Sequence, residues 1–205
     1  MADMRDLELM TRPFVNDCPR FLVNNELMRA SRSFFHKTQC WHENIIVGFG
    51  KGRNMGQMAA PEKDQAIIAV VDVMKRGTTQ RLRKSANKRV LANGAGDPRE
   101  YTATTSTLLL GPAPKDTFIA EVIVAVRPSL AATSIPEKVL EESGETIVAG
   151  ALHTLLNMRE CNWSDPAMAD TYRRKFNAGV RDMLNKLLTG FVNMPGHATA
   201  KYPFI

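Results

Sequence analysis

The sequence predicts an α+β protein that is mainly a helical bundle of three principal helices, with an inserted small antiparallel β region and an extended C-terminal tail. Apolar residues recur with a period near 3.6 within about 19–41, 136–158 and 166–189, which predicts the helices. Segments rich in Ile and Val fall within about 65–127 and predict the strands. Because no strand–helix alternation repeats along the chain, we expect one inserted sheet within a single domain of residues 1–205.

Composition supports a protein with a substantial core. The chain has 205 residues, of which 44% are hydrophobic and 23% are charged, and this is typical of one globular domain. No apolar run approaches the ~20 residues that span a bilayer, and the N-terminus lacks the pattern of a signal peptide, so we expect synthesis in the cytoplasm and no membrane contact. Cys18, Cys40 and Cys161 form no recognisable disulfide framework.

The N-terminal part predicts an extended segment followed by a helix. Residues 1–17 show no apolar period, and proline in Thr11-Arg12-Pro13 disfavours a helix. A helix is expected from Pro19 onward. Its inner line should be Val23, Leu27, Ala30, Phe34 and Thr38, broadened by Phe21, Met28, Phe35 and Trp41.

The segment 44–64 predicts a long loop. Gly48, Gly50, Gly52, Gly56 and Pro61 interrupt any apolar period. Long loops are unusual inside compact domains. We therefore expect an arm or lid that is ordered only in an assembly and that a protease can cut before assembly.

The middle of the chain predicts strands. Residues 66–74 are rich in Ile and Val, 93–98 form a turn cluster, and 102–110 and 117–126 flank Gly111-Pro112-Ala113-Pro114-Lys115. The last two segments are expected to form a hairpin with a longer loop.

A basic stretch without acidic residues lies between these strands, in a chain of net charge +6. It could contact DNA phosphates or an acidic partner, or be the solvated face of a strand pair. Gly77, Thr78 and Thr79 favour a turn between strands over a helix. The basic residues are Lys75, Arg76, Arg81, Arg83, Lys84, Lys88 and Arg89.

The first of the two C-terminal helices should open with a capping box at Ser134-Ile135-Pro136-Glu137. Gly144 and Gly150 each cost about 1 kcal/mol of helix propensity relative to alanine, which indicates close approach of a neighbouring helix or else a kink. Its buried line is expected at Leu140, Gly144, Ile147, Ala151 and Leu155, widened by Val148, Leu152 and Leu156.

The last helix should begin at Asp165-Pro166 and end at Thr189-Gly190. Five basic residues fall outside its apolar stripe: Arg173, Arg174, Lys175, Arg181 and Lys186. The stripe itself is Ala169, Tyr172, Phe176, Gly179, Val180, Met183 and Leu187.

The tail 191–205 carries apolar and aromatic side chains that are unfavourable in water. It is expected either to fold back on its own core or to dock on another protein. The residues expected to bind the partner are Phe191, Met194, Tyr202, Phe204 and Ile205.

No catalytic, cofactor or metal site is expected. Gly48-Phe49-Gly50-Lys51-Gly52-Arg53 lacks the Lys-Ser/Thr pair and the following helix of a phosphate loop. His36, Cys40 and His42 lack the distant second pair that a structural zinc site needs. His153 and His197 lack a recognisable nucleophile setting.

Several short motifs follow one another in a characteristic order. They are Phe14–Pro19, then Phe34, Thr38 and Trp41, then Gly96–Tyr101, Leu108 and Leu110 before Pro112, Ala125–Ser129, Ala149–Leu152, Trp163–Pro166, and Tyr172, Phe176, Gly179 and Val180. This order resembles the head-to-tail adaptor, or connector, proteins of short-tailed bacteriophages. Residues 44–64 depart from the pattern, so the resemblance implies nothing for them.

The resemblance implies a non-enzymatic virion protein of the phage neck, made in the bacterial cytoplasm. It implies a ring of twelve copies beneath the portal protein, a channel that conducts DNA without sequence-specific binding, and contact with the next tail component, a tail tube, nozzle or fibre protein. It also implies that 191–205 reach the portal.

Two other structural or binding roles remain open. A tail-tube or stopper protein one ring further down would share these features. A nucleic-acid-binding regulator would use the basic residues between Lys75 and Arg89 on a recognition helix. An enzyme is the third alternative.

Overall fold

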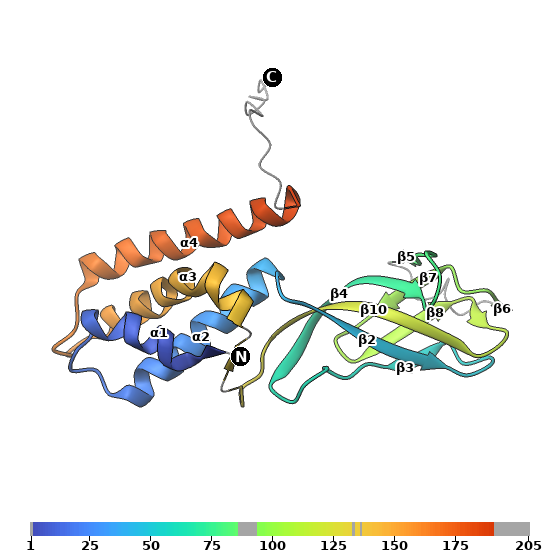
Figure 1. The fold of residues 1–205 in the computed structure, drawn as a ribbon, viewed down its shortest axis with the longest axis horizontal. Helices are drawn as coiled ribbons and strands as arrows, with labels where there is room; N and C mark the ends of the chain where they lie inside the picture. Colours follow the sequence, from blue (N-terminus) through green and yellow to red (C-terminus); the bar gives the residue numbers. More distant parts are fainter. Residues whose placement is uncertain (1, 86–93, 133, 136, 191–205) are drawn as a thin grey trace, which may run out of the picture.

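The computed structural model describes residues 2–85, 94–132, 134–135 and 137–190. Helices gather at one end of an elongated molecule and strands at the other (Figure 1). The protein is therefore a mixed α/β protein, and the prediction of a mainly helical bundle with a small β insertion is wrong. The strands of the β end form more than an insertion because they begin at His42, well before residue 65.

The helical end confirms the three principal helices. The central helix α3 packs against α1, α2 and α4. The first predicted helix ends at Thr38 rather than near 41, because Gln39 adopts a left-handed conformation with φ 52°. The elements are α1 (Met4–Thr11), the 3-10 helix η1 (Arg12–Phe14), α2 (Arg20–Thr38), α3 (Glu137–Leu156) and α4 (Pro166–Leu188).

The expected extended lead-in is instead largely helical. Leu7 of α1 is buried in the core, and the hydroxyl of Thr11 donates to the carbonyl oxygen of Leu7 at 2.7 Å. Pro13 does not interrupt α1, because it lies within η1 after that helix has ended. Before α1, the short strand β1 (Ala2–Asp3) pairs with β11 (Ser134–Ile135).

The β end packs two sheets face to face. The first sheet has the antiparallel order β2-β10-β4 and the second the order β3-β8-β7-β5. Their inner faces bury aromatic and branched side chains between them. The strands are β2 (His42–Phe49), β4 (Gln65–Lys75), β10 (Phe118–Pro128), β3 (Met55–Gln57), β8 (Thr107–Gly111), β7 (Glu100–Ala103) and β5 (Arg83–Lys84).

The predicted loop at 44–64 contains two strands, which corrects the expectation of an arm ordered only in an assembly. Every residue of β2 pairs with β10, and Ile45, Val47 and Phe49 point into the core. A Cβ added at Gly56 of β3 would lie 2.6 Å from Cγ1 of Val47, so this glycine allows the two sheets to approach. Of the glycines that hid the strand period, Gly56 is thus part of the sheet packing.

The predicted hairpin of 102–110 with 117–126 is also wrong. Strand β8 pairs with β7 and β3, whereas β10 pairs with β2 and β4. The β region is not wholly antiparallel, because β5 runs parallel to β7 and β6 (Ala95–Gly96) runs parallel to β9 (Ala113–Pro114). The partners of β10 are therefore decided by long-range pairing, whereas β7 and β8 pair as neighbours in the chain.

One continuous core joins the two ends. Val23 and Ile147 are fully buried in it, and Tyr172 packs against it half-buried, so the three far-apart helical segments share an interior as predicted. Strand β10 continues this core toward α2, and the amide of Val126 donates to the carbonyl oxygen of Trp41 at 2.9 Å.

Candidate interaction surfaces

Helix α4 packs against the rest of the protein through a narrow line of buried side chains. Asp165 caps its start by accepting from the Met168 amide at 2.9 Å, and Pro166 occupies the first turn, as predicted. Only Ala169, Phe176, Val180 and Met183 are buried. Most of its remaining surface faces solvent and both flanks are open, so α4 separates two grooves.

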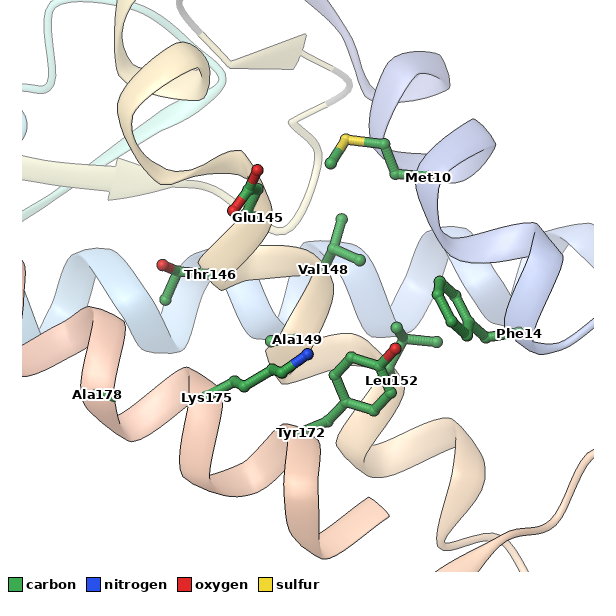
Figure 2. Close-up of a pocket in the computed structure, with 10 residues that line it drawn as sticks. All are labelled: Met10, Phe14, Glu145, Thr146, Val148, Ala149, Leu152, Tyr172, Lys175 and Ala178. Carbon is green, nitrogen blue, oxygen red and sulfur yellow. The ribbon is translucent and has the colours of Figure 1, made fainter. Parts of the chain in front are cut away.

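The groove on one flank is apolar. It has a volume of about 440 Å³ and lies between α1 and η1 on one side and α4 on the other, with α3 as its floor (Figure 2). Met10 is 43% and Phe14 is 44% exposed at its rim. The floor includes Val148, Ala149 and Leu152.

Aromatic and charged groups give this groove its shape. Phe14 and Tyr172 meet edge to face with ring centroids 5.6 Å apart. Nζ of Lys175 lies 5.0 Å from the Tyr172 ring centroid, and burial raises the pKa of the Tyr172 hydroxyl. Glu145 stands on the opposite side (Figure 2). The groove therefore has an apolar floor, with one acidic side chain, Glu145, and one basic side chain, Lys175, among the residues that line it.

The cleft on the other flank of α4 is polar. It has a volume of about 350 Å³ and is lined by residues of α2, α3 and α4. Lys37 lies over the Phe176 ring with Nζ 5.0 Å from the centroid, and Arg29 contacts the buried Glu26 at 2.8 Å. Nδ1 of His153 lies 3.2 Å from the carbonyl oxygen of Ala169, a hydrogen bond when Nδ1 carries the proton.

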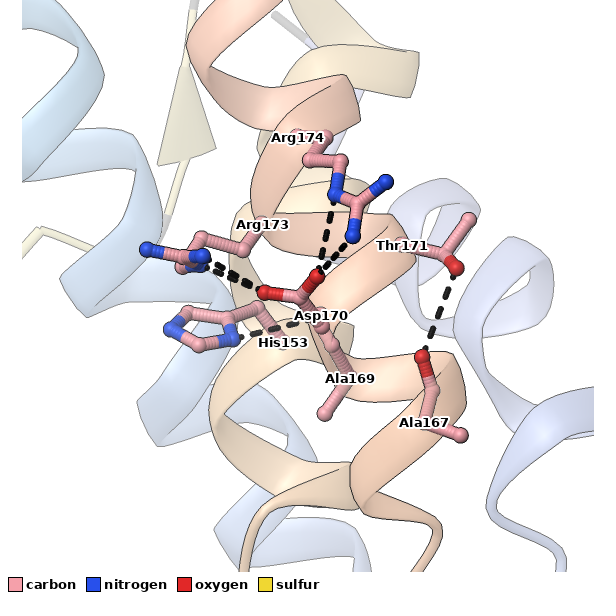
Figure 3. Close-up of polar contacts among 7 residues, drawn as sticks. All are labelled: His153, Ala167, Ala169, Asp170, Thr171, Arg173 and Arg174. Atoms are coloured by element: carbon pink, nitrogen blue, oxygen red, sulfur yellow. Dashed lines mark hydrogen bonds and ion pairs between the residues drawn. The ribbon is translucent and has the colours of Figure 1, made fainter.

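The predicted basic residues of α4 lie outside the buried line. Asp170 accepts hydrogen bonds from Arg173 and Arg174, each at 2.6 Å, and His153 lies beside this group (Figure 3). The hydrogen bonds from Arg173 and then Arg174 lower the pKa of the Asp170 carboxyl. Each arginine thus presents a partly neutralised charge at the surface.

The predicted basic stretch lies at the β end, on strands and a turn. Arg81 contacts Asp72 at 3.3 Å, and Lys75 contacts Asp97 at 3.4 Å. Within the described residues, three exposed members form no ion pair: Arg76, Arg83 and Lys84. Lys88 and Arg89 lie outside the described residues. Gly77 has φ 76°, which confirms the predicted turn, and the described part of the stretch, residues 75–85, contains no recognition helix.

The predicted partner-binding residues of the tail, Phe191, Met194, Tyr202, Phe204 and Ile205, lie outside the described residues. The described chain leads into the tail from the end of α4. Leu188, the last residue of that helix, is 85% exposed.

Among the described residues, the remaining polar candidates are not brought together, and His197 lies outside those residues. His36 and His42 are exposed, and Cys40 is half-buried and accepts from the Thr38 hydroxyl at 3.2 Å. Burial raises the pKa of the Cys40 thiol. The three cysteines are free. Among the residues that the structure describes, no group of three or more His, Cys, Asp or Glu side chains could hold a metal ion.

No protein-family model matches the chain, and no curated protein matches its sequence. In the described ranges, no helix combines the length and apolar character needed to cross a bilayer.

Sequence reasoning missed Met10 and Phe14, because residues 1–17 were expected to be extended. A signal was present: Leu7 and Met10 are three residues apart, and Thr11 follows Leu7 by four. In the structure, Leu7 packs inward while Met10 lines the groove.

Proposed function

We propose that the protein is a structural component of a bacteriophage virion, a head-to-tail adaptor that assembles as a ring beneath the portal protein. In this role it continues the DNA channel, offers a platform to the next tail component and carries out no chemistry. The order of sequence motifs described above supports the proposal, and so do the open surfaces on both flanks of α4.

The apolar groove between α1, α3 and α4 is the observation that carries the proposal. Met10 and Phe14 leave large apolar groups in water at its rim, and exposed apolar surface of this kind marks interaction sites. In a ring, each copy contacts its two neighbours through two different surfaces. The apolar groove and the polar cleft are two such surfaces on opposite flanks of α4. We propose that a neighbouring copy covers the groove.

The unpaired basic residues of the β end fit contact with DNA that passes through a channel. Arg76, Arg83 and Lys84 are exposed and lie on a turn and a short strand. Such charges bind the phosphate backbone without reading sequence. This placement does not favour a sequence-specific regulator.

The proposal is tested by mixing the purified protein with the portal protein of a short-tailed phage. Negative-stain images are expected to show an additional ring on the portal. Met10→Glu should retain the melting temperature but fail to form the ring, because it places a charge at the groove rim. Leu9→Glu is the matched control, since Leu9 is an exposed apolar residue of the same helix that does not line the groove. A ring formed equally well by both variants would remove the groove from the proposal.

A further inference from the structure

We propose that Arg32 of α2 and Arg127 of β10 together form a binding site for an oxyanion, a phosphate or a carboxylate. The site lies where the helical end meets the β end. It stands on the structure alone and does not depend on the proposed adaptor role.

The two arginines come from elements that pack against each other. Helix α2 contacts β10, and Arg32 lies in the second half of that helix. Arg127 is the penultimate residue of β10 and pairs through its backbone with Ala66 of β4. Both side chains are half-buried. The site is therefore supported by the rigid parts of both ends and is still open to solvent.

Each guanidinium has one nitrogen that is unsatisfied within the described part of the chain. Nη1 of Arg32 and Nε of Arg127 are buried and have no hydrogen-bond partner, and neither side chain forms an ion pair there. Three other arginines at the helical end are paired with carboxylates: Arg12 and Arg20 share Glu8, and Arg29 contacts Glu26. Buried polar groups are nearly always hydrogen-bonded, so two unsatisfied guanidinium groups at one junction require an explanation.

The two groups also repel each other. Burial lowers the pKa of Arg32, and the nearby charge of Arg127 lowers it further. Arginine stays protonated in proteins, so losing a proton cannot relieve this repulsion. A counter-charge is the remaining way to stabilise the pair.

An oxyanion supplies both missing interactions. Water could accept hydrogen bonds from the buried nitrogens, but it would leave the two positive charges uncompensated. A phosphate or carboxylate accepts from several N–H groups at once and neutralises charge, and guanidinium groups match its geometry. Two sources offer this chemistry: free inorganic phosphate, or an acidic side chain of a second copy of the protein.

The experiment measures the melting temperature of the full chain in chloride and in millimolar inorganic phosphate at matched ionic strength. If phosphate is the ligand, a concentration near 100 times its Kd should raise the melting temperature by about 5–10 °C. Arg32→Met and Arg127→Met should each lose this rise. In chloride they should melt at or above the wild-type temperature, because one of the two repelling charges is gone. Arg76→Met, at an exposed and unpaired arginine of the β end, should respond to phosphate like the wild type.

A second arm varies protein concentration in chloride and follows size by sedimentation. If a second copy supplies the anion, the wild-type melting temperature should rise with protein concentration as larger species form, and both Met variants should lose that dependence. The site is refuted if neither phosphate nor protein concentration stabilises the wild type. It is also refuted if the Met variants respond as the wild type does, or if Arg76→Met loses the response equally.

Discussion

The ring of Phe176 on α4 lies directly over Gly150 on α3. A Cβ added at Gly150 would stand 2.8 Å from Cδ2 of Phe176 and 3.1 Å from Cβ of Ala30 on α2. Glycine at this position therefore lets three helices meet at one point. This explains why α3 keeps a residue that is unfavourable in a helix.

Gly150→Ala is accordingly expected to destabilise the protein. Alanine gains about 1 kcal/mol of helix propensity, but overpacking in a filled core typically costs about 1–3 kcal/mol. The Phe176 ring is buried and cannot move aside easily. We expect a net loss of about 1 kcal/mol or more, which should lower the melting temperature by at least about 2–4 °C.

Gly144→Ala is the matched control in the same helix. Its added Cβ would meet only Cδ2 of Leu7, at 3.3 Å, and that atom is the far end of a flexible side chain. We expect no loss of stability, or a gain of up to about 1 kcal/mol. Equal losses for both variants would show that close approach is not the reason for Gly150.

Removing the cap of α4 should weaken the helix from its start. The Asp165 carboxylate accepts from the Met168 amide, and replacing such a cap with alanine costs about 1 kcal/mol. Asp165→Ala should therefore lower the urea midpoint with an unchanged m-value. Asp165→Asn keeps an accepting oxygen and should remain close to the wild type. A midpoint lowered equally by both changes would mean that charge, and not the hydrogen bond, is what matters.

Glu8 should make stability depend on pH in the acid range. Burial acts to raise the pKa of this carboxyl, but hydrogen bonds from Arg20 and Arg12 and their charges outweigh it, so the pKa is lowered. A carboxyl with a lowered pKa stabilises the fold fully above its unfolded pKa of about 4.3. That stabilisation is lost as the pH falls through the folded pKa.

Glu8→Gln therefore should lower the melting temperature at pH 7 and flatten its decline between about pH 5 and pH 2. Asp182→Asn is a control, because Asp182 contacts Lys186 on the exposed surface of α4 and should change the profile little. A wild-type slope retained in Glu8→Gln would assign the acid sensitivity to other carboxyls.

The sequence was most informative where one helix face alone is buried. Most of the predicted lines of α2 and α3 are buried, including Val23, Leu27, Ile147 and Ala151, because a 3.6-residue period depends only on local spacing. Phe21, which was predicted to broaden the line of α2, is instead 68% exposed. Gly150 of α3 also lies in close approach to neighbouring helices, as expected, whereas Gly144 does not require glycine in the same way. Local pattern was sufficient there because the buried residues of each helix recur with the helical period.

The sequence pattern did not predict strand pairing between segments that lie far apart in the chain. Strand β10 pairs with β2 and β4 rather than with its neighbour β8, and no local signal specifies that choice. The strands within 44–64 were hidden because several glycines interrupt the apolar period, and one of them, Gly56, permits contact between the sheets. The candidate sites were missed for the same reason: Phe14 meets Tyr172, and the charge of Arg127 comes near Arg32, only after folding.

The tail 191–205 supplies the last prediction, which concerns assembly. The described core is built from residues between Leu7 and Leu187, so a chain ending at Gly190 should fold and melt as the full chain does. If the tail docks on the portal, the shortened protein should no longer join portal-containing heads.

Shortening could also act by removing length alone. A full-length variant with serine at Phe191, Met194, Tyr202 and Phe204 separates these effects, because it keeps the length and loses the apolar side chains. We expect that this variant, like the shortened protein, will not bind portal-containing heads in a pull-down assay. Normal incorporation of this variant would show that the apolar side chains of the tail do not make the contact.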